Sequence, residues 1–182
     1  MTKKILILLF ILIPIKANAL IEVDITRGNL NPLPLAVSPL SIDEESRKGF
    51  EKILKKENIG SEISNIVENN LRTSGLFNPL DKNAFLQAPD IANLKPRFED
   101  WNLIKAQALI TGKVNYVDDK LRVEFRLWDV LAAKEMMALA FTTVPSNWRR
   151  VGHIISDKVY ERLTGEKGYF DTRIIYVSEE GP

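Results

Sequence analysis

Two segments of the chain repeat apolar residues at the spacing of an amphipathic helix. The first covers residues 60–74, with a stripe formed by Ile59, Ile63, Ile66, Val67 and Leu71. The second follows a cap at Ser146 or Asn147, and its recurring positions are Trp148, Val151, Ile155, Val159 and Arg162, with Ile154 and Leu163 alongside. Gly75 and Gly165 follow the two stripes, and glycine readily adopts the left-handed conformation that ends helices. We therefore predict two helices, each ending at its glycine.

Alternation of apolar and polar residues between these helices predicts a meander of three strands. The strands cover residues 108–117, 121–130 and 134–144, and the turns between them fall at Asp118-Asp119 and Ala132-Ala133. The middle strand alternates most regularly, with one face formed by Leu121, Val123, Phe125 and Leu127. Earlier in the chain, residues 33–40 predict a buried strand and residues 77–80 a short extended piece.

The remaining segments have weaker patterns. Residues 41–56 are rich in charge and predict a weak helix or an ordered loop, whereas residues 84–95 contain Pro89 and predict a loop. Residues 98–106 predict a shorter helix with Trp101 and Ile104 in the core. Taken together, these elements indicate an α+β fold, a two-layer domain in which helices pack on one face of a mixed β-sheet.

The first 19 residues have the layout of a secretory signal peptide. Lys3 and Lys4 precede an unbroken apolar run at residues 5–13, and Ala17-Asn18-Ala19 supplies the small side chains of a cleavage site. A core helix or a membrane anchor is the alternative, but this run is short of the roughly 20 residues that cross a hydrocarbon core. We predict cleavage after Ala19 and a periplasmic location, with no direct membrane insertion after cleavage.

Composition and charge exclude several classes of function. Removal of Lys3, Lys4 and Lys16 with the signal peptide leaves 22 of the 25 basic residues against 24 acidic ones, so no positive excess favours nucleic acid. Cysteine is absent, which excludes disulfides and thiolate ligands. No phosphate-binding glycine loop and no G-x-S-x-G nucleophile motif occurs. We therefore expect no catalytic residues, no cofactor and no metal site.

A few polar and aromatic residues still need a role. The single histidine, His153, precedes Asp157 by one helical turn and is expected to form an exposed hydrogen-bonded pair with it. Arg149 and Arg150 stand in a first helical turn, where cations oppose the helix dipole, and this predicts a specific salt bridge within the domain or with a following one. The three tryptophans are expected to fill the core: Trp101, Trp128 and Trp148.

Several motifs, in their joint order, resemble the TolB family, the periplasmic component of the Tol-Pal cell-envelope system. They are residues 34–40, 71–80, 108–112 and 125–129, and a closing run with Leu163-Thr164-Gly165, Gly168, Phe170, Thr172-Arg173-Ile174 and Tyr176-Val177. The resemblance implies that residues 1–19 are the signal peptide, residues 20–31 a partner-binding strand segment, and residues 32–168 the family's N-terminal domain, which is similar to an anticodon-binding-type α/β fold. Residues 169–182 then match the start of a six-bladed β-propeller, which we expect to be missing from this chain.

The resemblance also implies partners. In the family, an N-terminal segment docks onto TolA of the inner membrane, and it matches Ile21, Glu22, Val23, Asp24, Ile25, Thr26, Arg27 and Gly28. The propeller binds Pal of the outer membrane, so Pal binding is not expected without it. The implied role is a non-enzymatic link between TolA and Pal that maintains outer-membrane integrity and supports its invagination during cell division.

The sequence leaves two alternatives open, one for the N-terminal segment and one for the function. The apolar positions Ile21, Val23 and Ile25 suit addition of a strand to a partner's sheet, but they equally suit an edge strand of this domain's own sheet or a contact with a propeller. The alternative function is a periplasmic small-ligand-binding or hydrolytic domain, which would use a cleft beside Trp128 and the His153–Asp157 pair.

Overall fold

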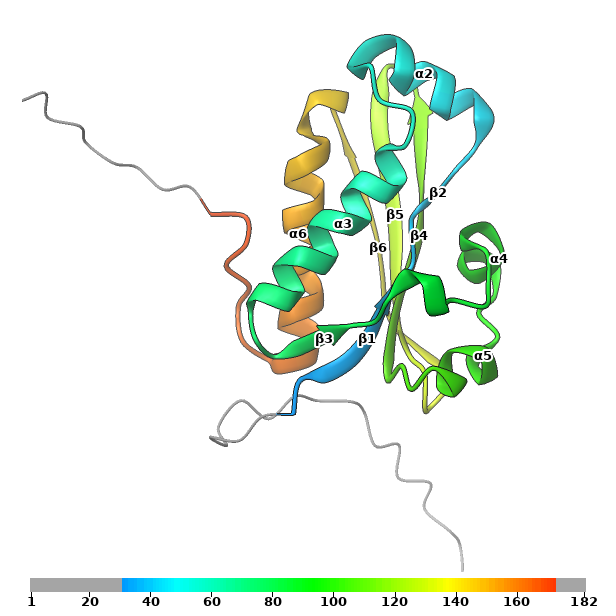
Figure 1. The fold of residues 1–182 in the computed structure, drawn as a ribbon. Coiled ribbons are helices and arrows are strands. Elements are labelled where there is room, and N and C mark those ends of the chain that lie inside the picture. Colours follow the sequence, from blue (N-terminus) through cyan, green and yellow to red (C-terminus); the bar gives the residue numbers. More distant parts are fainter. Residues whose placement is uncertain (1–30, 173–182) are drawn as a thin grey trace, which may run out of the picture.

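The computed structural model describes residues 31–172, and a mixed β-sheet of six strands forms their centre (Figure 1). The strands are β1 (Leu33–Val37), β2 (Ser41–Ile42), β3 (Phe77–Pro79), β4 (Ala108–Val117), β5 (Lys120–Asp129) and β6 (Lys134–Thr143). Their order across the sheet is β3-β1-β4-β5-β6, and the short β2 pairs with β4 beyond the end of β1. The pairs β3–β1, β1–β4 and β2–β4 are parallel, whereas β4–β5 and β5–β6 are antiparallel.

The predicted meander is confirmed, and its first turn follows from two aspartates. Asp118 and Asp119 both adopt the left-handed conformation, with φ angles of 50° and 57°. Two successive left-handed residues make the tight turn whose twist matches that of a β-hairpin. The Tyr116 hydroxyl donates a 2.6 Å hydrogen bond to the Asp119 carboxylate, and this bond raises the pKa of Tyr116.

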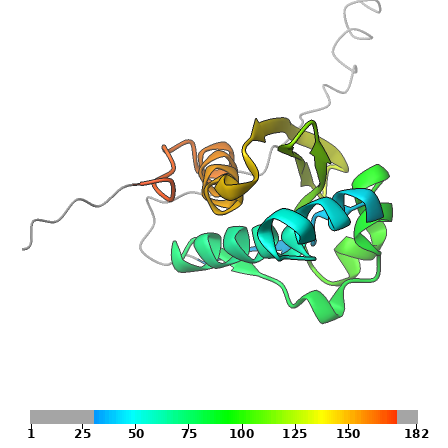
Figure 2. The same ribbon diagram turned by 90° about the horizontal axis from the view of Figure 1, so that it is seen from above.

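Three helices cover one face of the sheet: α2 (Glu44–Leu54), α3 (Ile59–Thr73) and α6 (Trp148–Thr164) (Figures 1 and 2). Between them and the sheet lies the main core, whose fully buried members include Leu35, Phe50, Ile63, Leu71, Phe125, Leu127 and Ile155. Gly75 and Gly165 have φ angles of 75° and 76°, as expected for residues that follow a helix end. The two helices predicted from apolar stripes, and the alternation of β5, are therefore confirmed.

Two short helices pack on the opposite face of the sheet: α4 (Pro89–Leu94) and α5 (Phe98–Leu103). A second, smaller core lies beneath them, and it is formed by Ala36, Ala92, Trp101, Ala106, Leu109 and Val130. Gln87 supports this core, because its Oε1 accepts hydrogen bonds from Trp101 Nε1 (2.7 Å) and from the backbone N–H of Arg97 (2.9 Å). The predicted α+β class with a mixed sheet is confirmed, with these two helices as an addition on the second face.

Two local predictions differ from the structure, one in a helix and one in a helix cap. Residues 84–95 are not all loop, because Pro89 begins α4 at a first-turn position that requires no N–H donor. Asn147 occupies the N-cap position of α6, as predicted, but its side chain donates to Thr143 Oγ1 (3.0 Å) and makes no capping hydrogen bond. A short 3₁₀ turn, Pro145–Asn147, leads into α6 and directs the Asn147 side chain towards β6. The charged segment 41–56 forms β2 and α2, which settles the choice between helix and loop.

Candidate interaction surface

The expected TolA-docking residues, Ile21 to Gly28, lie outside the described residues. The same holds for the signal peptide and for residues 173–182, so these expectations stay predictions. The described residues begin at residue 31, three positions after Gly28 along the chain and two before β1. A candidate interaction surface within the domain must therefore come from the described residues.

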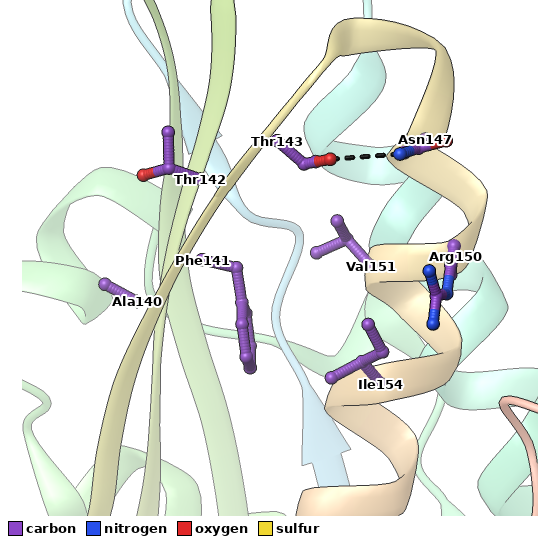
Figure 3. A pocket seen from close by; sticks show the side chains of 8 residues that line it. All are labelled: Ala140, Phe141, Thr142, Thr143, Asn147, Arg150, Val151 and Ile154. Carbon is purple, nitrogen blue, oxygen red and sulfur yellow. Dashed lines mark hydrogen bonds between the residues drawn. The ribbon is translucent and has the colours of Figure 1, made fainter.

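A groove of about 350 Å³ lies between the edge of β6 and the N-terminal half of α6 (Figure 3). Its apolar part is formed by Phe141 from the strand and by Val151 and Ile154 from the helix. Phe141 stacks on Phe125 of β5 with ring centroids 6.0 Å apart, which fixes the ring at the base of the groove. Asn147 and Arg150 add polar groups at the rim.

The strand beside this groove has a free edge among the described strands, because β6 pairs only with β5. Its last eight residues, Met136–Thr143, carry no charge, and Leu139 is 37% exposed. Near the strand start, Arg162 Nε donates a 3.3 Å hydrogen bond to the Met136 carbonyl and so covers part of the edge. An edge strand flanked by a helix has the geometry to receive an extended peptide. The arrangement therefore suits contact with an extended segment of another protein.

The prediction that His153 forms a hydrogen bond with Asp157 was wrong. His153 Nδ1 lies 2.9 Å from Asn70 Nδ2 of α3, and the same amide donates to Ser156 Oγ at 3.0 Å. The Asp157 carboxylate instead accepts from the backbone N–H groups of Phe170 (2.6 Å) and Asp171 (3.1 Å). Both side chains thus take partners from distant segments, which helical spacing alone does not reveal.

The structure also separates the residues of the alternative ligand site. Trp128 packs with the second core on the α4–α5 face of the sheet, whereas His153 lies on α6 on the opposite face. Trp128 Nε1 donates to Thr111 Oγ1 (2.9 Å), so its polar atom has a partner within the sheet. Trp101 and Trp148 are buried, as predicted, and Trp128 is partly buried against the second core.

The predicted salt bridge in the first turn of α6 is confirmed for Arg150, and its partner belongs to the segment that follows the helix. Arg150 binds Asp171 through Nε and Nη2, at donor–acceptor distances of 3.1 to 3.2 Å. The hydrogen bonds to Asp171 raise the pKa of Arg150. Sequence reasoning identified the cation but not its partner, because Asp171 is 21 residues away along the chain.

Residues 31–172 contain neither a metal-binding cluster nor a helix that could span a membrane. Within that range, no group of three or more histidine, cysteine, aspartate or glutamate side chains is arranged to hold a metal ion. None of the helices in the same range is both long and apolar enough to cross a membrane.

Comparison with known proteins identifies the family. The family model of the TolB amino-terminal domain matches residues 21–136. The chain is 86% identical over 177 residues to the Tol-Pal system protein TolB of Pelagibacter ubique (strain HTCC1062), and the match covers 97% of this chain. It spans 40% of the length of that relative.

A solved structure shows the same fold. The crystal structure of TolB from Acinetobacter baumannii superposes with a TM-score of 0.62 at 23% sequence identity, covering 84% of this chain and 33% of that one. The family model, which matches more than half of the chain, and the highly similar relative give the same assignment. The chain therefore belongs to the TolB family of the Tol-Pal system, and its described residues have the α+β fold found in TolB.

Proposed function

We propose that this chain is a non-enzymatic interaction module of the Tol-Pal system in the periplasm. The observation that supports this role most strongly is its 86% identity, over nearly its whole length, to a Tol-Pal system protein TolB. The signal-peptide layout of residues 1–19 supports export, with cleavage after Ala19. In this role the protein helps to maintain the outer membrane and supports its invagination during division.

The proposed docking element for TolA is the segment from Ile21 to Gly28. Its aliphatic residues Ile21, Val23 and Ile25 alternate with polar ones, so a single face of an extended chain is apolar. In strand addition, backbone hydrogen bonds supply much of the affinity, and alternate side chains fill pockets on the partner. The resemblance assigns Pal binding to the propeller, so we expect the 182-residue chain to retain TolA and not Pal.

The test is a binding measurement with purified TolA periplasmic domain and purified Pal against the mature chain. Replacing Ile21, Val23 and Ile25 together by serine removes three aliphatic side chains from the proposed contact. Burial of each is worth about 1.5–3 kcal/mol, so affinity for TolA should fall at least about 100-fold. Unchanged TolA affinity, or retention of Pal without TolA, would overturn the proposal.

The matched control changes the other face of the same segment. Glu22→Gln and Asp24→Asn keep the length and backbone of the segment and leave the aliphatic residues in place. We expect this control to bind TolA within about threefold of the original chain. Its affinity should also depend less on salt concentration than that of the original chain, because two exposed charges are removed. An equal loss in the control and test variants would indicate that the two carboxylates contribute as much to the contact as the aliphatic residues do.

His153→Ala separates this role from the hydrolytic or ligand-binding alternative. His153 contacts Asn70 on α3 and lies on the opposite face of the sheet from Trp128. An interaction module that docks through residues 21–28 should bind TolA unchanged in this variant. A hydrolytic activity of the original chain that disappears with His153 would favour the alternative.

A further inference from the structure

Residues 165–172 follow α6, reverse direction and run beside the helix towards its N-terminal half (Figure 1). We propose that these residues form a strap that is fastened to α6 and sets the direction in which the chain leaves the domain. The strap holds its last residue, Thr172, in a fixed position relative to α6, whereas an unfastened segment of the same length would let Thr172 move freely. This inference concerns no partner and is independent of the proposed docking of TolA.

The first fastening is Asp157, in the middle of α6. Its two carboxylate oxygens accept hydrogen bonds from the consecutive backbone N–H groups of Phe170 and Asp171. A carboxylate that accepts from backbone amides forms charge-assisted hydrogen bonds, which are stronger than neutral ones. Asp157 therefore holds the strap by its backbone, whatever side chains the strap carries.

The second fastening is the ion pair between Arg150 and Asp171. Two nitrogen atoms of the guanidinium bind the carboxylate, so the contact fixes orientation as well as distance. Arg150 stands in the first turn of α6, whereas the strap begins at the other end of the helix, after Thr164. The strap is thus held near the N-terminal half of α6 and not only where it begins.

The strap also packs closely against α6 through Gly168 and two aromatic side chains. A Cβ atom added at Gly168 would lie 2.4 Å from Cα of Asp157, so only glycine lets the strap approach the helix this closely. Phe170 and Tyr169 pack edge-on against Tyr160 of α6, with ring centroids 5.8 Å and 5.5 Å apart. Tyr160 is itself buried and contacts Phe77 of β3, which connects the strap to the main core.

These contacts do more than end a helix. The helix already ends at Gly165, which has a left-handed backbone and donates its N–H to the carbonyl of Glu161. The carboxylate of Asp157, the ion pair of Arg150 and the bare backbone of Gly168 all act on residues beyond that stop. Their common effect is to fix the position of Asp171 and of Thr172 behind it.

Distances between two spin labels test the strap directly, and the absence of cysteine from the chain makes the labelling specific. Labels at Lys52→Cys on α2 and Thr172→Cys at the end of the strap occupy exposed positions on the full chain. We expect a single narrow distance distribution for the labelled chain. Asp157→Ala and Gly168→Ala should each widen it at least twofold, because each releases the strap by a different physical means.

Lys158→Ala is the matched control, because this neighbour on α6 bonds to Glu161 of the same helix and not to the strap. It should leave the distribution unchanged. Widths in Asp157→Ala and Gly168→Ala that equal those of the control would overturn the proposal.

A second measurement needs no substitution and covers the case in which a variant fails to fold. Amide hydrogen exchange of the unmodified chain should show at least tenfold protection at Phe170 and Asp171 relative to Tyr169, whose N–H has no hydrogen-bond partner among residues 31–172. Exchange at Phe170 and Asp171 as fast as in an unfolded chain would also overturn the proposal.

Discussion

Asn115 Nδ2, on β4, donates a 2.7 Å hydrogen bond to Oδ2 of Asp43, the residue that caps α2. The same carboxylate accepts from the backbone N–H of Ser46 (2.8 Å) and from its hydroxyl (3.0 Å). Ser46 Oγ in turn accepts from the backbone N–H of Tyr116 (2.8 Å). A local helix cap thus also joins α2 to the β4–β5 hairpin of the sheet.

Asp43→Ala should destabilise the domain by at least about 1 kcal/mol, because the helix loses its cap and Asn115 loses an acceptor. Urea denaturation followed by circular dichroism measures the change. Asp43→Asn is the control, since asparagine caps helices about as well as aspartate. A loss below about 0.3 kcal/mol for the alanine variant would contradict this role of Asp43.

The same carboxylate predicts a pH dependence. The backbone N–H of Ser46, with help from the Ser46 hydroxyl and Asn115, holds the pKa of Asp43 below its ordinary value of 3.8. A folded-state pKa that is lowered gives stability that is present above the unfolded pKa and is lost as pH falls through the folded value. Asp43→Asn should therefore lose less stability than the original chain as the pH is lowered from 5 to below about 3. Parallel slopes for the two chains in acid would count against the lowered pKa.

Gly60→Ala should destabilise the domain even though alanine favours helices. A Cβ at this position in α3 would lie 2.1 Å from the backbone carbonyl oxygen of Leu40, which has no freedom to move aside as a side-chain end would. Overpacking of this kind costs about 1–3 kcal/mol, more than the roughly 1 kcal/mol that alanine gains in a helix. Thermal denaturation of Gly60→Ala checks it. Asn69→Ala, at an exposed position of the same helix, should be neutral or slightly stabilising.

Asn70 is expected to couple α3 to α6 through its side-chain amide, which donates to Ser156 Oγ and contacts His153. Asn70→Ala should cost about 1 kcal/mol, the usual net value of a hydrogen bond in a folded protein. Ser156 keeps its bond to the Gly152 carbonyl, so its hydroxyl is not left without a partner. A double-mutant cycle with Ser156→Ala measures the coupling, which we expect at about 0.5 kcal/mol or more. A coupling of zero would show that the two side chains act independently.

Gln87 should be essential to the second core. Its Oε1 accepts from the buried Trp101 Nε1 and from the partly buried N–H of Arg97, and Gln87→Leu leaves both donors without this acceptor. An unsatisfied buried donor costs about 1–3 kcal/mol, so the loss of the acceptor for Trp101 Nε1 should destabilise the variant by about 1 kcal/mol or more. Urea denaturation gives the size of the loss, and Trp101 fluorescence reports whether the second core loosens. Exposed Asn83→Leu serves as a control for the added apolar side chain on the nearby surface, and equal stabilities of the two variants would contradict this role of Gln87.

Much of the fold could be predicted because its elements have strong local causes. The alternation from Leu121 to Leu127 places every second side chain on one face, and all of these apolar residues are buried in β5. The stripe of α3 and the stop at Gly165 are equally local. Residues 84–95 were misjudged because α4 is a helix of six residues, held against the sheet by packing and not by its own pattern.

The family motifs, the long helices and the three-stranded meander follow from local sequence, because periodicity of side chains and left-handed glycines act within a few residues along the chain. The partners of the polar groups depend instead on how distant segments pack together. Asp157 binds the backbone of Phe170 and not His153, and Arg150 finds Asp171, because the chain after α6 folds back over the helix. Helical spacing brings side chains one turn apart close enough to form a pair. Their hydrogen bonds nevertheless go to the groups that the packing of distant segments places within reach.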